Sequence, residues 1–245
     1  MSNDATPVAP ERSFFQNVID VIVSPREAFE AVVRKPGFWL ALAFYLALVA
    51  AFTAVWVFKV DPAEFGKAQM IESGQWDKMA PEARAGAMSM QTRTVFAVFS
   101  AFAVLIGTPI FFLAVAGTLL FVYRFFYAGE VTFRQSLAIV SHAFAALALV
   151  TTPLLFLVYF LKGDWNLNPQ TAIQANLTLL LDRDTVSKAL WTFAGSIDLF
   201  SLWMVWLLAV GFGVATKKST ASALWGVAVP WAIIVLIKVA WALVF

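Results

Sequence analysis

The segment Leu190–Val214, LWTFAGSIDLFSLWMVWLLAVGFGV, contains a single charged residue, Asp198. An α-helix rises about 1.5 Å per residue, so about 20 apolar residues cross a hydrocarbon core of about 30 Å. The segment is therefore long enough to span a bilayer, and Asp198 would lie inside it. An ionised carboxylate at that depth is costly unless it faces a bundle interior and finds a partner there. The rest of the chain is expected to supply that partner and to shield it from lipid.

The composition places the whole chain in the membrane class. Of its 245 residues, 61% are hydrophobic and 13% are charged, against about 25% charged in soluble domains. The net charge of +2 is too small to favour a nucleic-acid partner. The chain has no Cys and only one His, His142, so cysteine chemistry is excluded and neither a metal site nor a cofactor is expected.

The hydropathy pattern predicts an all-α, polytopic membrane protein with five transmembrane helices, over about 38–58, 94–123, 133–161, 190–215 and 221–245. Residues 1–12 are expected to be a disordered lead, 13–36 to form interfacial helices, and 37–245 to form the membrane domain. Two long polar connections, 59–93 and 162–189, each contain a predicted helix. The helix in the second connection begins at Asn168-Pro169 and is expected to lie at the interface.

Two short amphipathic helices are predicted ahead of the first span. Ser13 and Gln16 form a capping-box pattern, and Ser24-Pro25 with Glu27 gives the start signal of the second helix. Both helices are too short to cross a membrane. They are expected to lie along the membrane surface or cap the bundle, and the alternative is a leader folded against the first span.

Three prolines lie inside predicted spans: Pro109, Pro153 and Pro230. A proline removes a backbone donor in mid-helix, so each is a predicted kink. The kink is clearest at Pro109, because the run Thr94–Tyr123 is longer than the hydrocarbon core requires and the excess must be absorbed.

Lys and Arg residues predict the orientation. Equal numbers lie on the two sides of the predicted membrane, but those on the N-terminal side are concentrated in short turns, which carry most of the positive-inside rule. We therefore expect the N-terminus in the cytoplasm and, after five spans, the C-terminus on the opposite side.

Depth in the membrane favours Lys238 as the partner of Asp198. Both are expected about 10–12 Å from the same surface, whereas His142 enters from the opposite side. The hypothesis is an ion pair between Asp198 and Lys238 inside the bundle, and the alternative is that Lys238 snorkels to the headgroups. His142 has two interpretations as well, a proton relay or an interhelical hydrogen bond.

Four patches of sequence share an order and spacing that can be compared with known families. They are an S-P-x-x-A-F segment at Ser24–Phe29, a G-x-x-(T/S)-F-(K/R)-Q-x-L segment at Gly129–Ala138, a D-x-F-x-x-W segment at Asp198–Trp203 with Gly211, and a basic turn at Lys217–Ser219. Together they resemble the Yip family of five-span membrane proteins (the Yip-one domain), in its bacterial branch. The resemblance runs from about Phe14 to the end of the chain.

The resemblance implies a multi-pass protein of the bacterial cytoplasmic (inner) membrane. Eukaryotic relatives are associated with Rab GTPases and early secretory vesicles. The acidic cytosolic motif with Tyr, Gly and Pro that precedes their first span is absent from this sequence. Rab binding is therefore not carried over to this chain.

The motif inventory predicts no catalytic residue. The sequence has no His/Cys/carboxylate cluster, no Walker-type loop and no nucleophile elbow. Aromatic spans, interfacial helices and sparse charge favour a non-enzymatic scaffold or accessory subunit of a membrane transport or envelope complex. Its expected partners are the lipid bilayer and a membrane protein of unknown identity. The alternative is a small transporter or channel with Asp198 and Lys238 on the pathway, because intramembrane charges and broken helices are typical of transporters.

Overall fold

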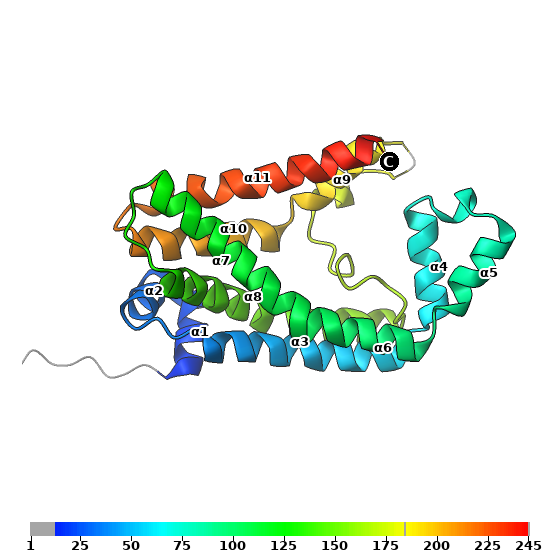
Figure 1. Cartoon of the computed structure of the whole chain (residues 1–245), viewed down its shortest axis with the longest axis horizontal. Helices are drawn as coiled ribbons and strands as arrows, with labels where there is room; N and C mark the ends of the chain where they lie inside the picture. The colour runs from blue at the N-terminus through cyan, green and yellow to red at the C-terminus, as the bar shows by residue number, and fades with distance from the viewer. Residues whose placement is uncertain (1–12, 184, 245) are drawn as a thin grey trace, which may run out of the picture.

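The computed structural model describes residues 13–183 and 185–244, so the expected disordered lead, residues 1–12, lies outside the described residues. Within them every regular element is a helix, and the one β-type pairing is an isolated bridge between Asn176 and Asp198. The all-α prediction is confirmed. The helices form an elongated bundle, from which α4 and α5 project at one end (Figure 1).

Four helices are long and apolar enough to cross a membrane, judged by length and composition. They are α3 (Trp39–Lys59), the composite helix Arg93–Phe125, α8 (Phe133–Lys162) and α11 (Thr220–Val244). Their bounds lie close to those of the first, second, third and fifth predicted spans. The chain is thus a multi-pass membrane protein.

The composite helix changes its hydrogen-bond pattern in the middle. It consists of α6 (Arg93–Phe102), a π-helical segment η2 (Ala103–Gly107) and α7 (Thr108–Phe125). Pro109 lies two residues after the end of this segment, and because proline has no N–H, a regular α-helical ladder is interrupted there. The Thr108 hydroxyl donates to the Ala103 carbonyl at 3.3 Å. By contrast, α8 continues through Pro153 and α11 through Pro230.

The fourth predicted span is divided into two helices. Residues 188–196 form α9 (Lys188–Ser196) and residues 199–215 form α10 (Leu199–Ala215), with Ile197 and Asp198 between them. The 17 residues of α10 rise about 26 Å, slightly less than the hydrocarbon thickness. The expectation of one continuous helix over 190–215 is therefore corrected, and five crossings stay a prediction.

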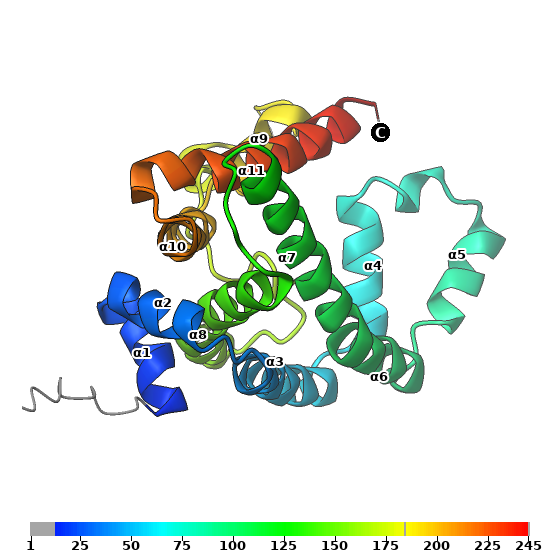
Figure 2. The ribbon, with the colours of Figure 1, turned by 60° about the vertical axis from the view of Figure 1, so that its left-hand side comes forward.

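The core of the bundle is built around α8. Helices α3, α7 and α10 pack against it, together with α1 (Phe14–Val23) and α2 (Pro25–Arg34), as Figure 2 shows. The side chains of residues 136–143 are all buried, and several are Ser or Ala. Small residues allow neighbouring backbones to approach closely. The N-terminal helices therefore dock on α8, and their position at the membrane interface stays a prediction.

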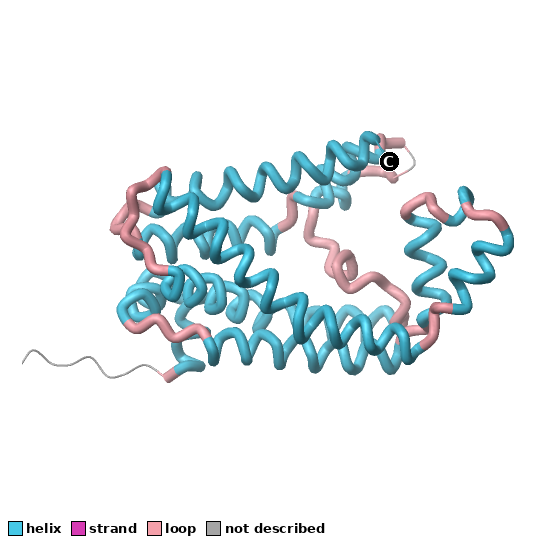
Figure 3. The backbone as a smooth tube through the Cα atoms, in the orientation of Figure 1, coloured by secondary structure: helices cyan, strands magenta, loops and turns pink. Residues whose placement is uncertain are grey.

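The opposite end contains α4 (Pro62–Glu72), η1 (Trp76–Lys78), α5 (Pro81–Ser89) and the long connection after α8. Figure 3 shows that connection mostly as loop, with one short 3-10 turn, η3 (Leu177–Leu180). The helix predicted from Asn168 is wrong. Asn168 Oδ1 instead accepts from the Gln170 N–H at 2.9 Å and closes a turn, and the backbone near Asn176 pairs with that of Asp198.

Candidate functional site

The residues of the family-like patches gather mainly at one end of the bundle. We call it the basic end and define it as residues 13–37, 124–135 and 216–220. It holds α1, α2, the turn between α7 and α8, and the turn between α10 and α11, all on the same side in Figure 1. The loop-rich end, residues 59–93 and 162–197, lies opposite and includes the two long connections of the chain (Figure 1).

The two N-terminal helices begin as their sequences predict. Ser13 Oγ accepts from the Gln16 N–H at 3.2 Å, and Pro25 occupies the first turn of α2 after Ser24. On α2 the side chains of Ala28, Phe29 and Val32 are buried. The S-P-x-x-A-F segment therefore supplies a helix start followed by an anchor for the core.

The anchor fits against a glycine on α10. A Cβ added at Gly211 would collide with Ile139 Cγ2 of α8 and lie 3.2 Å from Phe29 Cδ1 of α2. Three helices thus meet at a point where only a hydrogen side chain fits. Gly211, part of the patch that resembles the family's fourth span, is required by this close approach rather than by chemistry.

The start of α8 is tied to the end of α2. Thr132 and Gln135 form a complete capping box: the Gln135 N–H donates to Thr132 Oγ1 at 3.2 Å, and Gln135 Oε1 accepts from the Thr132 N–H at 3.0 Å. Gln135 Nε2 also donates to the Val33 carbonyl at 3.1 Å, and Arg134 Nε donates to the Pro36 carbonyl at 2.7 Å. The first of these bonds satisfies a carbonyl in the last turn of α2, and the second satisfies one in the segment that follows the helix. The patch at 129–138 therefore joins one helix start to another helix end.

Two further hydroxyls connect the remaining helices. Ser136 Oγ donates to the Ala116 carbonyl at 2.7 Å, which joins α8 to α7. The Tyr123 hydroxyl donates to the Ala223 carbonyl of α11, and its ring stacks on Phe212 with a centroid distance of 4.4 Å. No sequence pattern assigns a role to Tyr123. The signal that could have indicated this bond is a Tyr hydroxyl inside an apolar segment, because a buried Tyr hydroxyl usually finds a hydrogen-bond partner.

The basic end carries an excess of positive charge. Its seven Lys and Arg side chains face four Asp and Glu, a net charge of +3, whereas the loop-rich end has eight of each kind. All seven cationic residues of the basic end are exposed: Arg26, Arg34, Lys35, Arg124, Arg134, Lys217 and Lys218. The hydrogen bonds between helices therefore fix the positions of the helix ends, and the exposed surface of these ends carries a net positive charge.

Asp198 acts as a helix cap. Its Oδ1 accepts from the N–H groups of Phe200 at 3.0 Å and Ser201 at 2.9 Å. A carboxylate at a helix N-terminus is stabilised by these donors and by the helix dipole, so it needs no cationic side chain. The bridge to Asn176, with Leu199 N–H donating to the Ala175 carbonyl at 3.0 Å, holds the break between α9 and α10 in place.

The expected ion pair between Asp198 and Lys238 is not formed. Among the residues that the structure describes, no ion pair includes either side chain. Lys238 is exposed on α11 and Asp198 is half-buried at the start of α10. The expected depth of Asp198 requires a continuous helix, whereas the break at Ile197–Asp198 lets the carboxylate bond to the backbone at the start of α10.

His142 is buried in the middle of α8. Its Nδ1 lies 2.9 Å from the Ala138 carbonyl oxygen of the same helix, and its ring packs edge-on to Phe14 of α1 at 6.3 Å. This hydrogen bond lies within one helix, whereas one interpretation expects a bond between helices. Within the described ranges no group of three or more His, Cys, Asp or Glu side chains could hold a metal ion. The proton-relay interpretation stays a prediction.

Comparison with known proteins gives one family. The model of the Yip1 domain matches residues 19–242, which is most of the chain. No curated protein and no solved structure matches the chain. The match extends from α1 to the last turn of α11 and includes all four of the family-like patches. This chain therefore belongs to the Yip1-domain family of membrane proteins.

Proposed function

We propose that this Yip-family membrane protein is a non-enzymatic scaffold or accessory subunit of a membrane transport or envelope complex. The observation that carries the proposal is that polar side chains of the family-like patches form hydrogen bonds within the protein. Gln135, Arg134, Ser136 and Asp198 all bond to backbone atoms of the protein itself. Side chains that bond to the backbone hold helices in position. Such a role favours a structural scaffold over an enzyme that acts on a substrate.

The basic end is the surface that this scaffold would present. We place the protein in a bacterial cytoplasmic membrane with the basic end in the cytoplasm, because short cationic turns favour that side. There the seven exposed cations can contact anionic headgroups and an acidic surface of a membrane-protein partner. Complementary charge of this kind favours encounter and register between partners.

Affinity purification from native membranes tests the proposal. We expect one or more membrane proteins to copurify with the tagged chain in mild detergent, and to be lost from Lys217→Gln/Lys218→Gln. The matched control is Lys59→Gln/Lys162→Gln, which removes two exposed lysines at helix ends of the loop-rich end. A wild-type chain that captures nothing specific, or a partner retained equally by both double variants, contradicts the proposal.

The transporter alternative loses its main support. It placed Asp198 and Lys238 together on a pathway, whereas the carboxylate caps α10 and the lysine is exposed on α11. Measurement of ion and solute flux in proteoliposomes distinguishes the transporter from the scaffold. Flux that depends on Asp198, measured with Asp198→Asn, would favour transport over the scaffold.

A further inference from the structure

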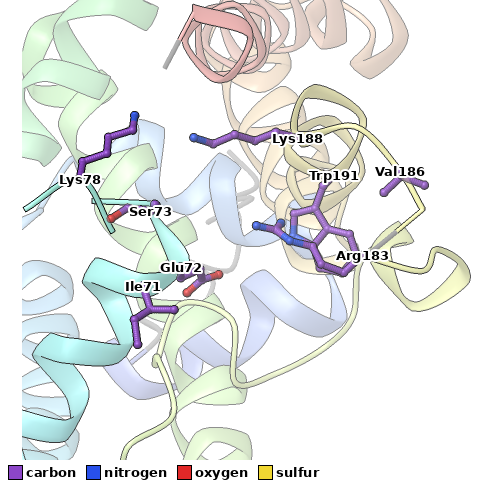
Figure 4. A pocket seen from close by; sticks show the side chains of 9 residues that line it. Ile71, Glu72, Ser73, Lys78, Arg183, Val186, Lys188 and Trp191 are labelled. Carbon is purple, nitrogen blue, oxygen red and sulfur yellow. The ribbon is translucent and has the colours of Figure 1, made fainter. Parts of the chain in front are cut away.

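A pocket of about 310 Å³ lies at the loop-rich end, away from the motif contacts. Two segments that are distant in sequence form it. One is the end of α4 with η1, which contributes Glu72, Ser73 and Lys78, and the other leads into α9 and contributes Arg183, Lys188 and Trp191 (Figure 4). Its volume is in the range of small-ligand sites.

The charges of the pocket are unbalanced. Among the described residues that line it, Lys78, Arg183 and Lys188 stand against one carboxylate, Glu72, which gives them a net charge of +2. Figure 4 shows the amino groups of Lys78 and Lys188 turned toward each other across the pocket. Within the described part of the chain, no ion pair joins Glu72 to any of these cations. Like charges that converge without an acidic partner repel each other, and an anion between them would remove that repulsion.

Two features pre-organise the pocket. The guanidinium of Arg183 lies over the ring of Trp191 at 4.9 Å, and this cation–π contact limits the positions available to its planar fork. Lys188 is the first residue of α9, so the positive end of that helix dipole adds to the field of the three side chains.

The pocket adjoins an apolar surface. On η3 and α9 the side chains of Leu179, Leu180 and Phe193 are exposed. Apolar side chains beside Trp and basic residues are typical of the boundary between hydrocarbon and headgroups. A ligand of this pocket would therefore be reached from the level of the lipid phosphates.

We propose that this pocket binds a phosphate group, carried by an anionic phospholipid headgroup or present as free phosphate. Arg offers paired donors to phosphate oxygens, and the two lysines add point charges on the other side. The proposal goes beyond the scaffold function and does not depend on it, because the residues involved lie at the end opposite the basic end.

Native mass spectrometry of the full chain in neutral detergent tests the site. The probes are short-chain phosphatidic acid, phosphatidylcholine of the same chain length, and inorganic phosphate as a competitor. Wild type should bind phosphatidic acid at least about ten-fold more tightly than Lys78→Gln/Arg183→Gln/Lys188→Gln, since charge-assisted bonds are lost. Displacement by inorganic phosphate indicates that the phosphate group suffices, and retention indicates that the lipid headgroup is required.

The matched control removes three exposed lysines of the same end that do not line the pocket, with Lys59→Gln/Lys67→Gln/Lys162→Gln. It should bind phosphatidic acid within about two-fold of wild type, as expected for weakly contributing surface charges. An equal loss in both triple variants, or no loss in either, overturns the proposal.

Glu72→Gln is a second test, in which the expected effect has the opposite sign. It remains available if the triple variant fails to fold. Removing the one carboxylate among the described residues that line the pocket should tighten phosphatidic acid binding several-fold and leave phosphatidylcholine unchanged. Unchanged or weaker binding of phosphatidic acid by Glu72→Gln would count against the site.

Discussion

The two ends of the bundle are held together in different ways. At the basic end, side chains bond across helices: Gln135 joins α8 to α2, Arg134 joins it to the segment after α2, and Tyr123 joins α7 to α11. At the loop-rich end, helix side chains hold a loop instead: Trp56 Nε1 donates to the Trp165 carbonyl at 3.0 Å, and the Tyr159 hydroxyl to that of Leu167 at 2.7 Å. The first end presents a fixed charged face, and the second leaves a charged pocket between separate segments.

The largest expected difference between the two ends is their sidedness. The chain has no Cys, so Ser222→Cys, in the first turn of α11 next to the basic end, and Ser73→Cys at the loop-rich end can be labelled singly. In intact cells a membrane-impermeant maleimide should label Ser73→Cys, and should reach Ser222→Cys only after permeabilisation. Labelling of both positions from one side would contradict the assignment of the two ends to opposite faces.

Removing the α2 anchor should weaken the basic end most. Phe29 is fully buried, so Phe29→Ala should destabilise the fold by about 3–5 kcal/mol through lost contacts and a cavity. Thermal unfolding in nanodiscs, followed by circular dichroism, measures the effect. Phe15→Ala on α1, where the side chain is 62% exposed, should change stability by about 1 kcal/mol or less. Similar losses in the two variants would mean that α2 is not anchored through Phe29.

The close approach at Gly211 gives a smaller effect of the same kind. Gly211→Ala should destabilise by about 1–3 kcal/mol, because the added methyl group overpacks the contact with Ile139 and Phe29. The control is Gly117→Ala on α7, where an added Cβ meets nothing within 4 Å. That variant should be neutral or stabilised by about 0.5–1 kcal/mol, as for Gly→Ala in an open helix position. If Gly211→Ala is as stable as the unaltered chain, the close contact of the three helices at Gly211 is contradicted.

The smallest expected effect distinguishes a cap from an ion pair at Asp198. Asp198→Asn should change stability by about 0.5 kcal/mol or less, since Asn caps helices about as well as Asp, and Asp198→Ala should lose about 0.5–2 kcal/mol. A buried ion pair would instead lose about 3–5 kcal/mol in Asp198→Asn. Lys238→Met is the companion variant, and no coupling between the two positions is expected in a double-mutant cycle.

Local signals in the sequence were sufficient for most helices. The caps at Ser13 and Thr132 and the apolar runs of α3, α8 and α11 depend on residues within a few positions of each other, so hydropathy and capping patterns locate them. The break at Asp198 was not predicted, because an apolar segment long enough to span gives no sign that its one carboxylate caps a second helix. The helix expected from Asn168-Pro169 is a turn, because the Asn168 side chain bonds to the backbone two residues later and the residues that follow pair with distant Asp198.

The sites depend on contacts that no local pattern contains. Gln135 bonds to Val33, and Lys78 and Lys188 line the same pocket, only because the fold brings together segments about 100 residues apart. The family-like patches indicated which residues matter at the basic end but not that their role is to join helices. The pocket residues belong to none of those patches, and their pattern in the sequence is that of ordinary solvated charges.

Thiol accessibility along α2 tests most directly whether the motif residues dock the N-terminal helices on the bundle. In native membranes opened to both sides, Val32→Cys, where the side chain is 3% exposed, should resist a hydrophilic maleimide, while Glu30→Cys on the outer face of the same helix should react. Adding Gln135→Ala, which removes the bond to Val33, should speed the reaction at Val32→Cys and leave Glu30→Cys unchanged. Equal reaction at the two positions in the otherwise unaltered chain would show that α2 is not docked, and would contradict the account.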